Sequence, residues 1–212
     1  MKLKANYFKS KKKILFYNID ILSYVNKSFN DSSVSNIINS KIKSNDKSIS
    51  FKDIKISLRK PVTLIAFGKA SSEMMNSFYN IIDKKNIKTA LLISHDIKRR
   101  KIFKNKKKIK YLSSTHPKIS KQSILAGKEI IKFVKNTSKN DTLIFLVSGG
   151  GSSMVASPID GITGSQKIKF INKLILSGIP ERETTIIKKN ISNLKAGRLL
   201  TFANTSKIYN FI

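Results

Sequence analysis

The sequence contains no cysteine among its 212 residues. This absence excludes a disulfide framework and a zinc site with thiolate ligands. No apolar run approaches the roughly 18 residues that would span a bilayer, so we expect no contact with a membrane. Residues 1–22 are basic and then apolar, but Asn18 and Asp20 interrupt the apolar part and no small-residue cleavage site follows. We therefore expect a cytosolic start rather than a signal peptide, and a cytoplasmic protein.

Acidic residues are also scarce, since 12 Asp and Glu face 42 Lys and Arg and the formal net charge is +30. One interpretation is a nucleic-acid partner, because clustered cations bind phosphate backbones. The other is a shift in composition without a function. We favour the second, because Lys is scattered over every segment and Arg, the preferred reader of bases and phosphates, is rare. The densest cluster, at residues 98–110, is predicted to be an exposed loop and is the best candidate for a nonspecific polyanion patch.

What the sequence does contain is an alternation of apolar strands with amphipathic helices. Strands are predicted at residues 53–58, 62–67, 90–93, 110–112, 143–147 and 208–212, and helices at 14–29, 72–82, 120–134, 166–177 and, as one or two, within 181–203. We expect an α/β fold: a Rossmann-like three-layer domain with a mainly parallel sheet, helices on both faces and an N-terminal helix. Residues 1–50 would be that helix and a polar loop packing on the main domain at residues 51–212.

The segment TLIFLVSGGGSS, residues 142–153, places three consecutive glycines and three serines at the end of an apolar run. Because the run is apolar throughout, it predicts a buried parallel strand that ends at the ligand-binding edge of the sheet. Three glycines cost entropy without a structural need, so we predict a loop whose N–H groups and Ser hydroxyls bind an anion such as phosphate. The spacing matches neither a P-loop, nor a dinucleotide fingerprint, nor a G-x-S-x-G nucleophile elbow.

A second turn, Gly68-Lys69, follows the predicted strand at 62–67 and precedes a helix. A cation at the positive end of a helix dipole is unfavourable unless an anion lies between them, so Lys69 either contacts a phosphate or is one more solvated lysine. His116 follows another predicted strand and is either a substrate ligand or a turn residue. His95 and His116 are the two histidines, and without a nearby carboxylate they predict no metal site.

Three further cations, Lys188, Lys195 and Arg198, fall in a predicted helical segment. Lys188 and Lys195 are seven residues apart, and Lys195 and Arg198 are three apart, so a helix would place them on one face. Such a face either binds a phosphate or carboxylate or simply faces the solvent.

Four blocks, taken together, resemble the N-terminal domain of the glycerate 2-kinase family, the DUF4147 type whose C-terminal half is called the MOFRL domain. The resemblance extends over residues 62–212. The blocks are AFGKA at 66–70 (family GAGKA), THP at 115–117 (GHP), LVSGGGSSMVASPIDGIT at 146–163 (SGGGSALL…P…GIT) and ETTIIKKNISNLKAGRLL at 183–200 (EINTVRKHLSxIKGGRLA).

The resemblance implies ATP-dependent phosphorylation of D-glycerate at its 2-hydroxyl group, with Mg²⁺ and a site between two domains. By matching motif, Lys69 is the catalytic residue, which stabilises the transferring phosphoryl group. The implied partners are glycerate and ATP. We expect no membrane partner and rank nucleic acid last. The residues implied to bind substrate or phosphate are Ser148, Gly149, Gly150, Gly151, Ser152, Ser153, His116, Lys188, Lys195 and Arg198.

This sequence departs from the family pattern in its last block and at its end. Lys188 stands where the family has Arg, which removes bidentate capture of a carboxylate or phosphate. Thr185-Ile186 replaces Asn-Thr, Asn190 replaces His and Ala196-Gly197 replaces Gly-Gly. No metal ligand is predicted, with Asp160 the one weak option. We expect a chain truncated in its last strand, before the MOFRL domain, with little or no activity unless a separately encoded C-terminal domain completes the site.

Two other functions stay open. One is a phosphate- or nucleotide-binding module without catalysis. The other is a basic nucleic-acid-binding protein, although its aromatic residues are not interleaved with basic ones as stacking on bases requires.

Overall fold

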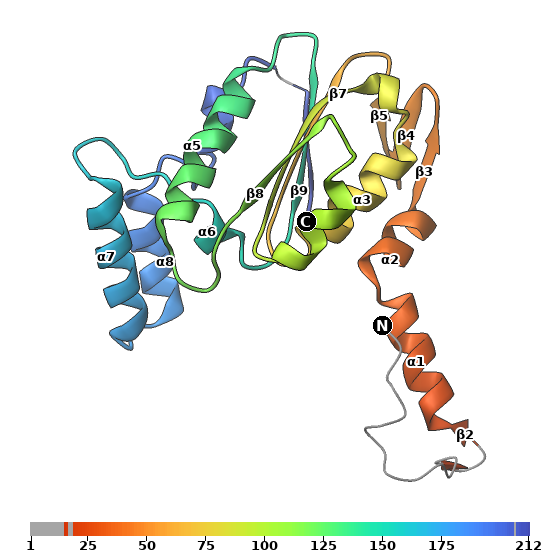
Figure 1. Cartoon of the computed structure of the whole chain (residues 1–212), viewed down its shortest axis with the longest axis horizontal. Helices are drawn as coiled ribbons and strands as arrows, with labels where there is room; N and C mark the ends of the chain where they lie inside the picture. Colours follow the sequence, from red (N-terminus) through yellow and green to blue (C-terminus); the bar gives the residue numbers. More distant parts are fainter. Residues whose placement is uncertain (1–14, 17–18, 206) are drawn as a thin grey trace.

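The computed structural model describes residues 15–16, 19–205 and 207–212, so the expectations for residues 1–14 lie outside it. Its centre is a five-stranded sheet in which every strand runs parallel to its neighbours (Figure 1). The strand order is β10-β9-β6-β7-β8. The strands are β6 (Val62–Phe67), β7 (Ile87–Ser94), β8 (Ile109–Ser113), β9 (Thr142–Val147) and β10 (Ile208–Phe211).

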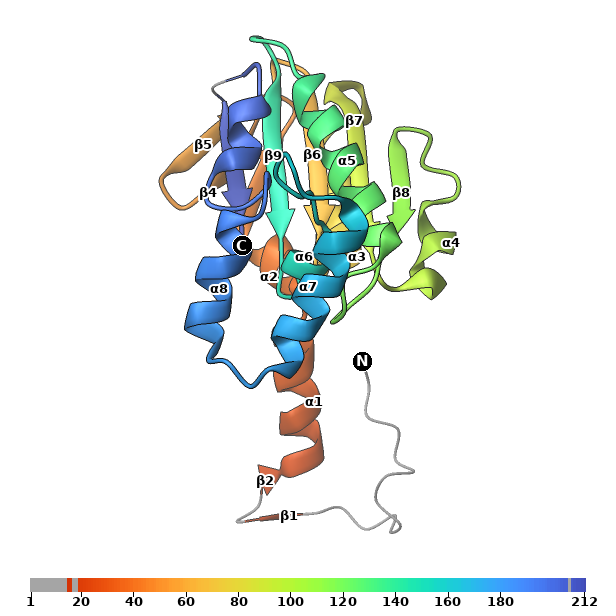
Figure 2. The ribbon, with the colours of Figure 1, turned by 90° about the vertical axis from the view of Figure 1, so that its left-hand side faces the viewer.

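Helices cover both faces of this sheet, as Figure 2 shows with α5 in front of the strands. Helix α3 (Ser71–Ile81) packs on one face and α5 (Lys121–Lys135) on the other. Alternate residues of β6 serve the two faces: Leu64 belongs to the core on the α3 side and Ile65 to the core on the α5 side. Central strands buried on both faces need apolar side chains at every position. The predicted α/β fold with helices on both faces is confirmed.

The segment at residues 30–50, predicted as a polar loop around a short helical turn at residues 34–39, contains more regular structure than that. It holds α2 (Val34–Lys41), β3 (Ile42–Asn45) and most of β4 (Ser48–Phe51), which pairs with β5 (Ile54–Ser57) in a separate antiparallel sheet. Asn45 forms the hairpin turn, because its Oδ1 accepts hydrogen bonds from the backbone N–H groups of Lys47 (3.0 Å) and Ser48 (2.8 Å). The polar residues that form this turn resemble those of a loop, so the hairpin was not predicted. Strand β4 also crosses the expected domain boundary after residue 50.

The N-terminal helix begins later than predicted. Two short strands, β1 (Leu15–Phe16) and β2 (Ile19–Asp20), precede α1 (Ile21–Asp31). Asp competes with helical backbone hydrogen bonds and favours helix starts over helix interiors, which fits a helix that begins directly after Asp20. Figure 1 shows α1 extending away from the sheets, beyond α2.

The remaining elements lie between and after the strands. Residues 98–110, predicted as a loop, include most of the 3₁₀ helix η3 (Ile97–Arg99), all of α4 (Arg100–Phe103) and the start of β8. The others are η2 (Lys84–Asn86), α6 (Gly151–Met154), α7 (Gly164–Leu176), α8 (Glu181–Asn190) and η4 (Arg198–Phe202). Across the described residues, no helix has both the length and the apolar character that crossing a bilayer requires.

Candidate functional site

Two loops meet where the strand order reverses. From β6 the chain proceeds outward through β7 to β8, and it then returns to the other side of β6 to form β9 and β10. Parallel sheets bind ligands at the carboxyl ends of the strands, at the point of this reversal. Here that point lies between Gly68-Lys69, after β6, and the glycine loop at residues 148–153, after β9. The sequence placed both turns on this edge, and the topology brings them side by side.

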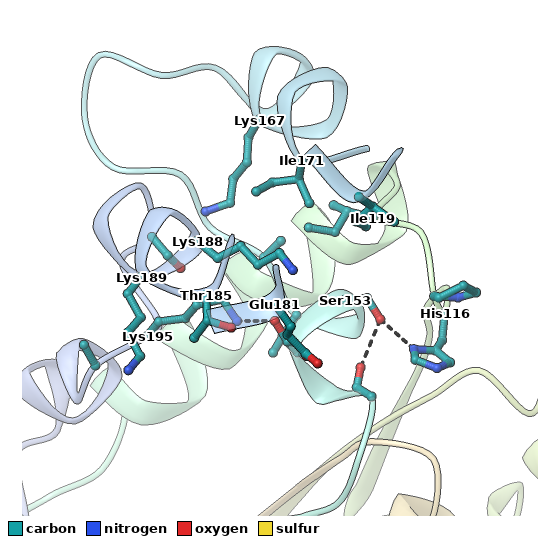
Figure 3. A pocket seen from close by; sticks show the side chains of 18 residues that line it. His116, Ile119, Ser153, Lys167, Ile171, Glu181, Thr185, Lys188, Lys189 and Lys195 are labelled. Carbon is teal, nitrogen blue, oxygen red and sulfur yellow. Dashed lines mark hydrogen bonds between the residues drawn. The ribbon is translucent and has the colours of Figure 1, made fainter. Parts of the chain in front are cut away.

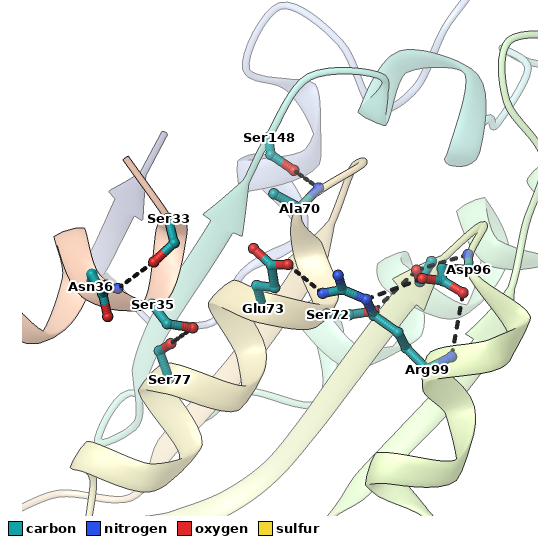
Figure 4. Close-up of polar contacts among 11 residues, drawn as sticks. Ser33, Ser35, Asn36, Ala70, Ser72, Glu73, Ser77, Asp96, Arg99 and Ser148 are labelled. Carbon is teal, nitrogen blue, oxygen red and sulfur yellow. Dashed lines mark hydrogen bonds and ion pairs between the residues drawn. The ribbon is translucent and has the colours of Figure 1, made fainter. Parts of the chain in front are cut away.

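The two loops are hydrogen-bonded to each other. The backbone N–H of Lys69 donates to the carbonyl of Gly149 (2.8 Å), and that of Ser148 donates to the carbonyl of Phe67 (3.1 Å). The Ser148 Oγ accepts from the backbone N–H of Ala70 (3.0 Å; Figure 4). Ser148 is thus engaged in joining the two loops.

Most of the glycines are required by this close approach. Gly68 has φ +120°, and a Cβ there would lie 2.3 Å from the carbonyl oxygen of Ser148. Gly150 has φ +87°, and a Cβ at Gly151 would lie 2.7 Å from the ring of Phe67. Only Gly149 of the run has ordinary room for a side chain. The prediction that three glycines lack a structural need is therefore wrong for two of them, because the loop is packed as well as open.

The loop nevertheless presents a row of free donors. The backbone N–H groups of Gly149 to Ser152 donate to no protein acceptor within the described part of the chain. Successive unpaired N–H groups in a turn with a left-handed residue form a concave site for an anion. Anion binding by this loop stays a prediction, and these free N–H groups are the observation that supports it.

Lys69 and His116 both lie against this loop. A Cβ on Gly150 would be 3.2 Å from Cγ of Lys69 and 3.1 Å from the ring of His116, so both side chains border the same residue. The Oγ of Ser153 donates to the carbonyl of Gly150 (3.0 Å), which leaves it to accept from Nδ1 of His116 (2.8 Å). The proton of the neutral imidazole then sits on Nδ1, and Nε2 is the acceptor.

The charge around His116 favours this neutral form. Burial lowers its pKa below 6.5, and the positive charges of Lys69 and His95 lower it further. The His95 and His116 rings lie 6.2 Å apart. At neutral pH His116 therefore acts as a hydrogen-bonding group and not as a cation.

A cavity of about 620 Å³ continues from the glycine loop toward α7 and α8 (Figure 3). Lys188 and Lys195, both predicted to bind substrate, line it together with Ser152 and His116. Nζ of Lys195 donates a hydrogen bond to Oγ of Ser152, which ties this cation to the glycine loop. Burial, and then the charge of Lys188, lower the pKa of Lys195 to about 8.

The helical-face argument for these cations is wrong, although Lys188 and Lys195 do line one cavity. Helix α8 ends at Asn190, and Ala196 (φ +54°) and Gly197 (φ +81°) are left-handed, so Lys195 lies in a loop. Arg198 lies outside the cavity lining, because Nη1 donates to the carbonyls of Lys189 (2.5 Å) and Ser192 (2.9 Å). It closes the end of α8 in this structure and does not face the cavity.

Two lysines of the cavity lining, Lys167 and Lys189, were not among the predicted site residues. Lys167, on α7, is only 2% exposed. Its Nζ donates to the carbonyls of Ser157 (2.9 Å) and Ile191 (2.6 Å). A signal was present in the sequence, since Lys167 falls on the apolar stripe of its helix together with Ile171 and Leu174, where a lysine needs a special partner.

The described residues do not offer a Mg²⁺ site. They include no group of three or more His, Asp or Glu side chains with metal-binding geometry. The carboxylate of the cavity lining is Glu181, and the weak option, Asp160, is exposed and outside that lining. Hard divalent cations need several oxygen ligands, which this arrangement does not supply. The N–H groups and cations do fit the phosphates of ATP.

Together these features define a doubly wound α/β protein with a cationic crevice at its switch point. More specifically, the chain belongs to the family described as "Domain of unknown function (DUF4147)", whose model matches residues 20–212.

Named relatives agree with this membership. The chain is 37% identical over 142 residues to the glycerate 2-kinase of Sulfurisphaera tokodaii and 30% identical over 154 residues to that of Picrophilus torridus. The matches cover 66% and 72% of this chain but 33% and 36% of the relatives, so the chain matches about a third of their length. A crystal structure of a Pyrococcus horikoshii OT3 protein has a TM-score of 0.76 at 26% identity, covering 89% of this chain and 42% of that one. The chain is a glycerate kinase-like domain.

Proposed function

We propose that this domain forms one wall of a site that transfers a phosphoryl group from ATP to the 2-hydroxyl group of D-glycerate. The observation that carries the proposal is the row of free N–H groups from Gly149 to Ser152, with Lys69 packed against it at the switch point. The names of the Sulfurisphaera and Picrophilus relatives supply the substrate.

Phosphoryl transfer depends mainly on positioning and on stabilising negative charge. The N–H groups and cations of the crevice could contribute to both. ATP supplies the phosphoryl group when bound. The N–H groups of Gly149–Ser152 would hold phosphate oxygens, and Lys69 would neutralise the charge that develops on them. Lys188 and Lys195 would hold the carboxylate of glycerate. Neutral His116 offers Nε2 as a proton acceptor within the same crevice. No step is assigned to Mg²⁺, because the described residues lack its ligands.

The test separates binding from turnover. Isothermal titration with ATP and with D-glycerate measures binding, and a coupled assay of ADP release measures turnover by the 212-residue chain. We expect Lys69→Ala to weaken ATP binding at least about tenfold, because a cation beside a phosphate is lost. Lys128→Ala, an exposed lysine on α5, is the matched control and should bind ATP like the wild type. Wild-type protein that binds neither ligand would contradict the proposal.

We expect little turnover by this chain alone, since the relatives are about three times longer than the matched part. Turnover at an ordinary rate would overturn that expectation. Binding that depends on Lys69, without any turnover even when the remainder of a relative's chain is added, would favour the non-catalytic phosphate- or nucleotide-binding module.

A nucleic-acid-binding function stays the other alternative, and we rank it below the phosphotransferase. In the basic segment at residues 98–110, Arg99 pairs with Glu73 (2.6 Å) and Asp96 (3.1 Å), and Lys110 pairs with Glu129 (2.6 Å). Cations that already have carboxylate partners contribute less to phosphate binding. A steep loss of DNA binding with salt, unaffected by Lys69→Ala, would support this alternative.

A further inference from the structure

Lys167 is a buried cation that joins three segments. It lies on α7 and points into the cavity (Figure 3). Its ammonium group donates to the carbonyl of Ser157, after the glycine loop, and to that of Ile191, at the end of α8. A charge in such a position must be compensated, and the carbonyl end of a helix supplies partial negative charge. Two backbone carbonyls therefore keep Lys167 folded into the wall of the cavity.

This compensation is incomplete. An ammonium group has three N–H donors, and Lys167 uses two of them on protein acceptors. The same cavity holds Lys188 and Lys195, and none of the three lysines forms an ion pair with a carboxylate in the described part of the chain. Among the described residues, the lining holds one carboxylate, Glu181, against the ammonium groups of Lys167, Lys188, Lys189 and Lys195, so positive charge is in excess and the lysines repel one another in a partly desolvated space. An oxyanion with several acceptor atoms would relieve this repulsion and fill the remaining donors.

We propose that Lys167 is a third ligand residue of an oxyanion site, in which its ammonium group joins those of Lys188 and Lys195 to bind a carboxylate or phosphate group with uptake of protons. The inference rests on the proposed function, because it assigns the anionic group of the substrate to this cavity. Lys167 touches that group directly, in addition to its bonds to Ser157 and Ile191.

We expect proton uptake because burial and the positive charges of the cavity lower the pKa values of Lys167 and Lys195. Burial, and then the charge of Lys195, lower the pKa of Lys167 to about 8, and the pKa of Lys195 is also about 8. A bound anion favours the charged lysines and raises both pKa values. Above about pH 8, binding must therefore take up protons, and affinity must fall as pH rises.

Other titratable groups also face the cavity. They are Glu181, Lys188 and Lys189 of α8 and His116 of the loop after β8. The pKa of His116 is lowered below 6.5, so this ring is already neutral above pH 8.

The experiment is calorimetric titration with inorganic phosphate and, separately, with D-glycerate at about pH 7 and about pH 9, each in two buffers of different ionisation enthalpy. The wild type should take up protons at the higher pH and bind more weakly there. Lys167→Met should weaken binding at least about tenfold at the lower pH and reduce the proton uptake. Lys167→Arg, which cannot lose its proton, should bind with less uptake. Lys169→Met, exposed on the same helix, is the control and should behave like the wild type.

The outcomes separate the two proposals. Wild-type protein that binds neither phosphate nor glycerate contradicts the proposed function itself. Wild-type binding that Lys167→Met leaves unchanged, while the variant is merely less stable, shows that Lys167 is a structural cross-link and overturns this inference alone. If Lys167→Met does not fold, the wild type is compared with Lys167→Arg instead. Wild-type protein that binds at about pH 9 without proton uptake also overturns this inference. The preferred anion shows whether the site takes a phosphate or a carboxylate.

Discussion

Glycines at the switch point either allow two loops to pack together or present an N–H group to a ligand. The sequence alone does not distinguish these two roles. Gly68 and Gly151 leave room for Ser148 and Phe67, whereas Gly149 contributes an N–H group and has space for a side chain. A run of glycines predicts that a backbone comes close to something. Whether the neighbour is a ligand or another loop depends on strand order, which local sequence does not contain.

Gly68→Ala should destabilise the fold strongly. The new Cβ would meet the Ser148 carbonyl at 2.3 Å, in a conformation (φ +120°) that disfavours side chains. Strain and overpacking together should cost about 3 kcal/mol or more of unfolding free energy, as measured by urea denaturation. Gly161→Ala is the matched control, because Gly161 also has positive φ (+82°) but open space around it, and it should cost only about 1–2 kcal/mol. Equal losses in the two variants would show that the contact with Ser148 does not matter.

At the scale of elements, the carboxyl ends of the strands form the proposed site and the amino ends contribute to stability. The carboxyl ends of β6 and β9 carry the crevice. The amino end of β9 begins after Asp141, a buried carboxylate that accepts hydrogen bonds from Lys88 (2.6 Å) and from the N–H and hydroxyl of Ser138 (both 3.0 Å). Burial alone would raise the pKa of Asp141, but the bonds from Lys88 and Ser138 outweigh it and hold the pKa below 3.8. This end of the sheet is built for stability.

Asp141→Asn should lower the unfolding free energy by roughly 2 kcal/mol at neutral pH, because charged hydrogen bonds are lost. A depressed pKa stabilises the fold above the unfolded value of 3.8, and this stabilisation disappears as pH falls through the folded value. The difference from the wild type should therefore shrink below about pH 4 in urea titrations. Asp53→Asn, an exposed carboxylate, should change little. A gap that persists in acid would mean that the charge of Asp141 is not what stabilises the fold.

How well each element could be predicted follows from its burial. Strands β6 and β9 are apolar at nearly every position because helices cover both faces of the sheet. Their sequence therefore predicts buried parallel strands without ambiguity. Strands β3 and β4 belong to a small sheet with one solvated side, and their Ser, Asn and Lys residues resemble a loop. In the loop beyond α8, Ala196 is left-handed although alanine favours helix by propensity, so tertiary contacts override local preference there.

At the scale of the whole molecule, charge is the dominant imbalance. The net charge is +30, and the ion pairs among the described residues involve only Asp83, Asp141, Glu73, Asp96 and Glu129 as carboxylates. Most lysines therefore repel other cations, and a large net charge destabilises a compact state.

Added salt should consequently stabilise this protein. Raising NaCl from about 0.01 M to about 0.1 M shortens the screening length from roughly 30 Å to about 10 Å. The melting temperature should rise by a few degrees, as followed by circular dichroism. Lys69→Ala should show the same rise, which excludes anion binding at the glycine loop as its cause. A melting temperature that falls with NaCl would mean that attractive pairs outweigh the repulsion.

The hydrogen bond between Ala70 and Ser148 joins residues that are 78 positions apart in the chain. The loops it connects belong to adjacent strands, but β7, β8 and α5 are made between them. Closing so long a segment is entropically costly and slow compared with forming local structure. The crevice is therefore among the last parts of the domain to assemble, so recovery of ligand binding during refolding should lag behind recovery of helical structure.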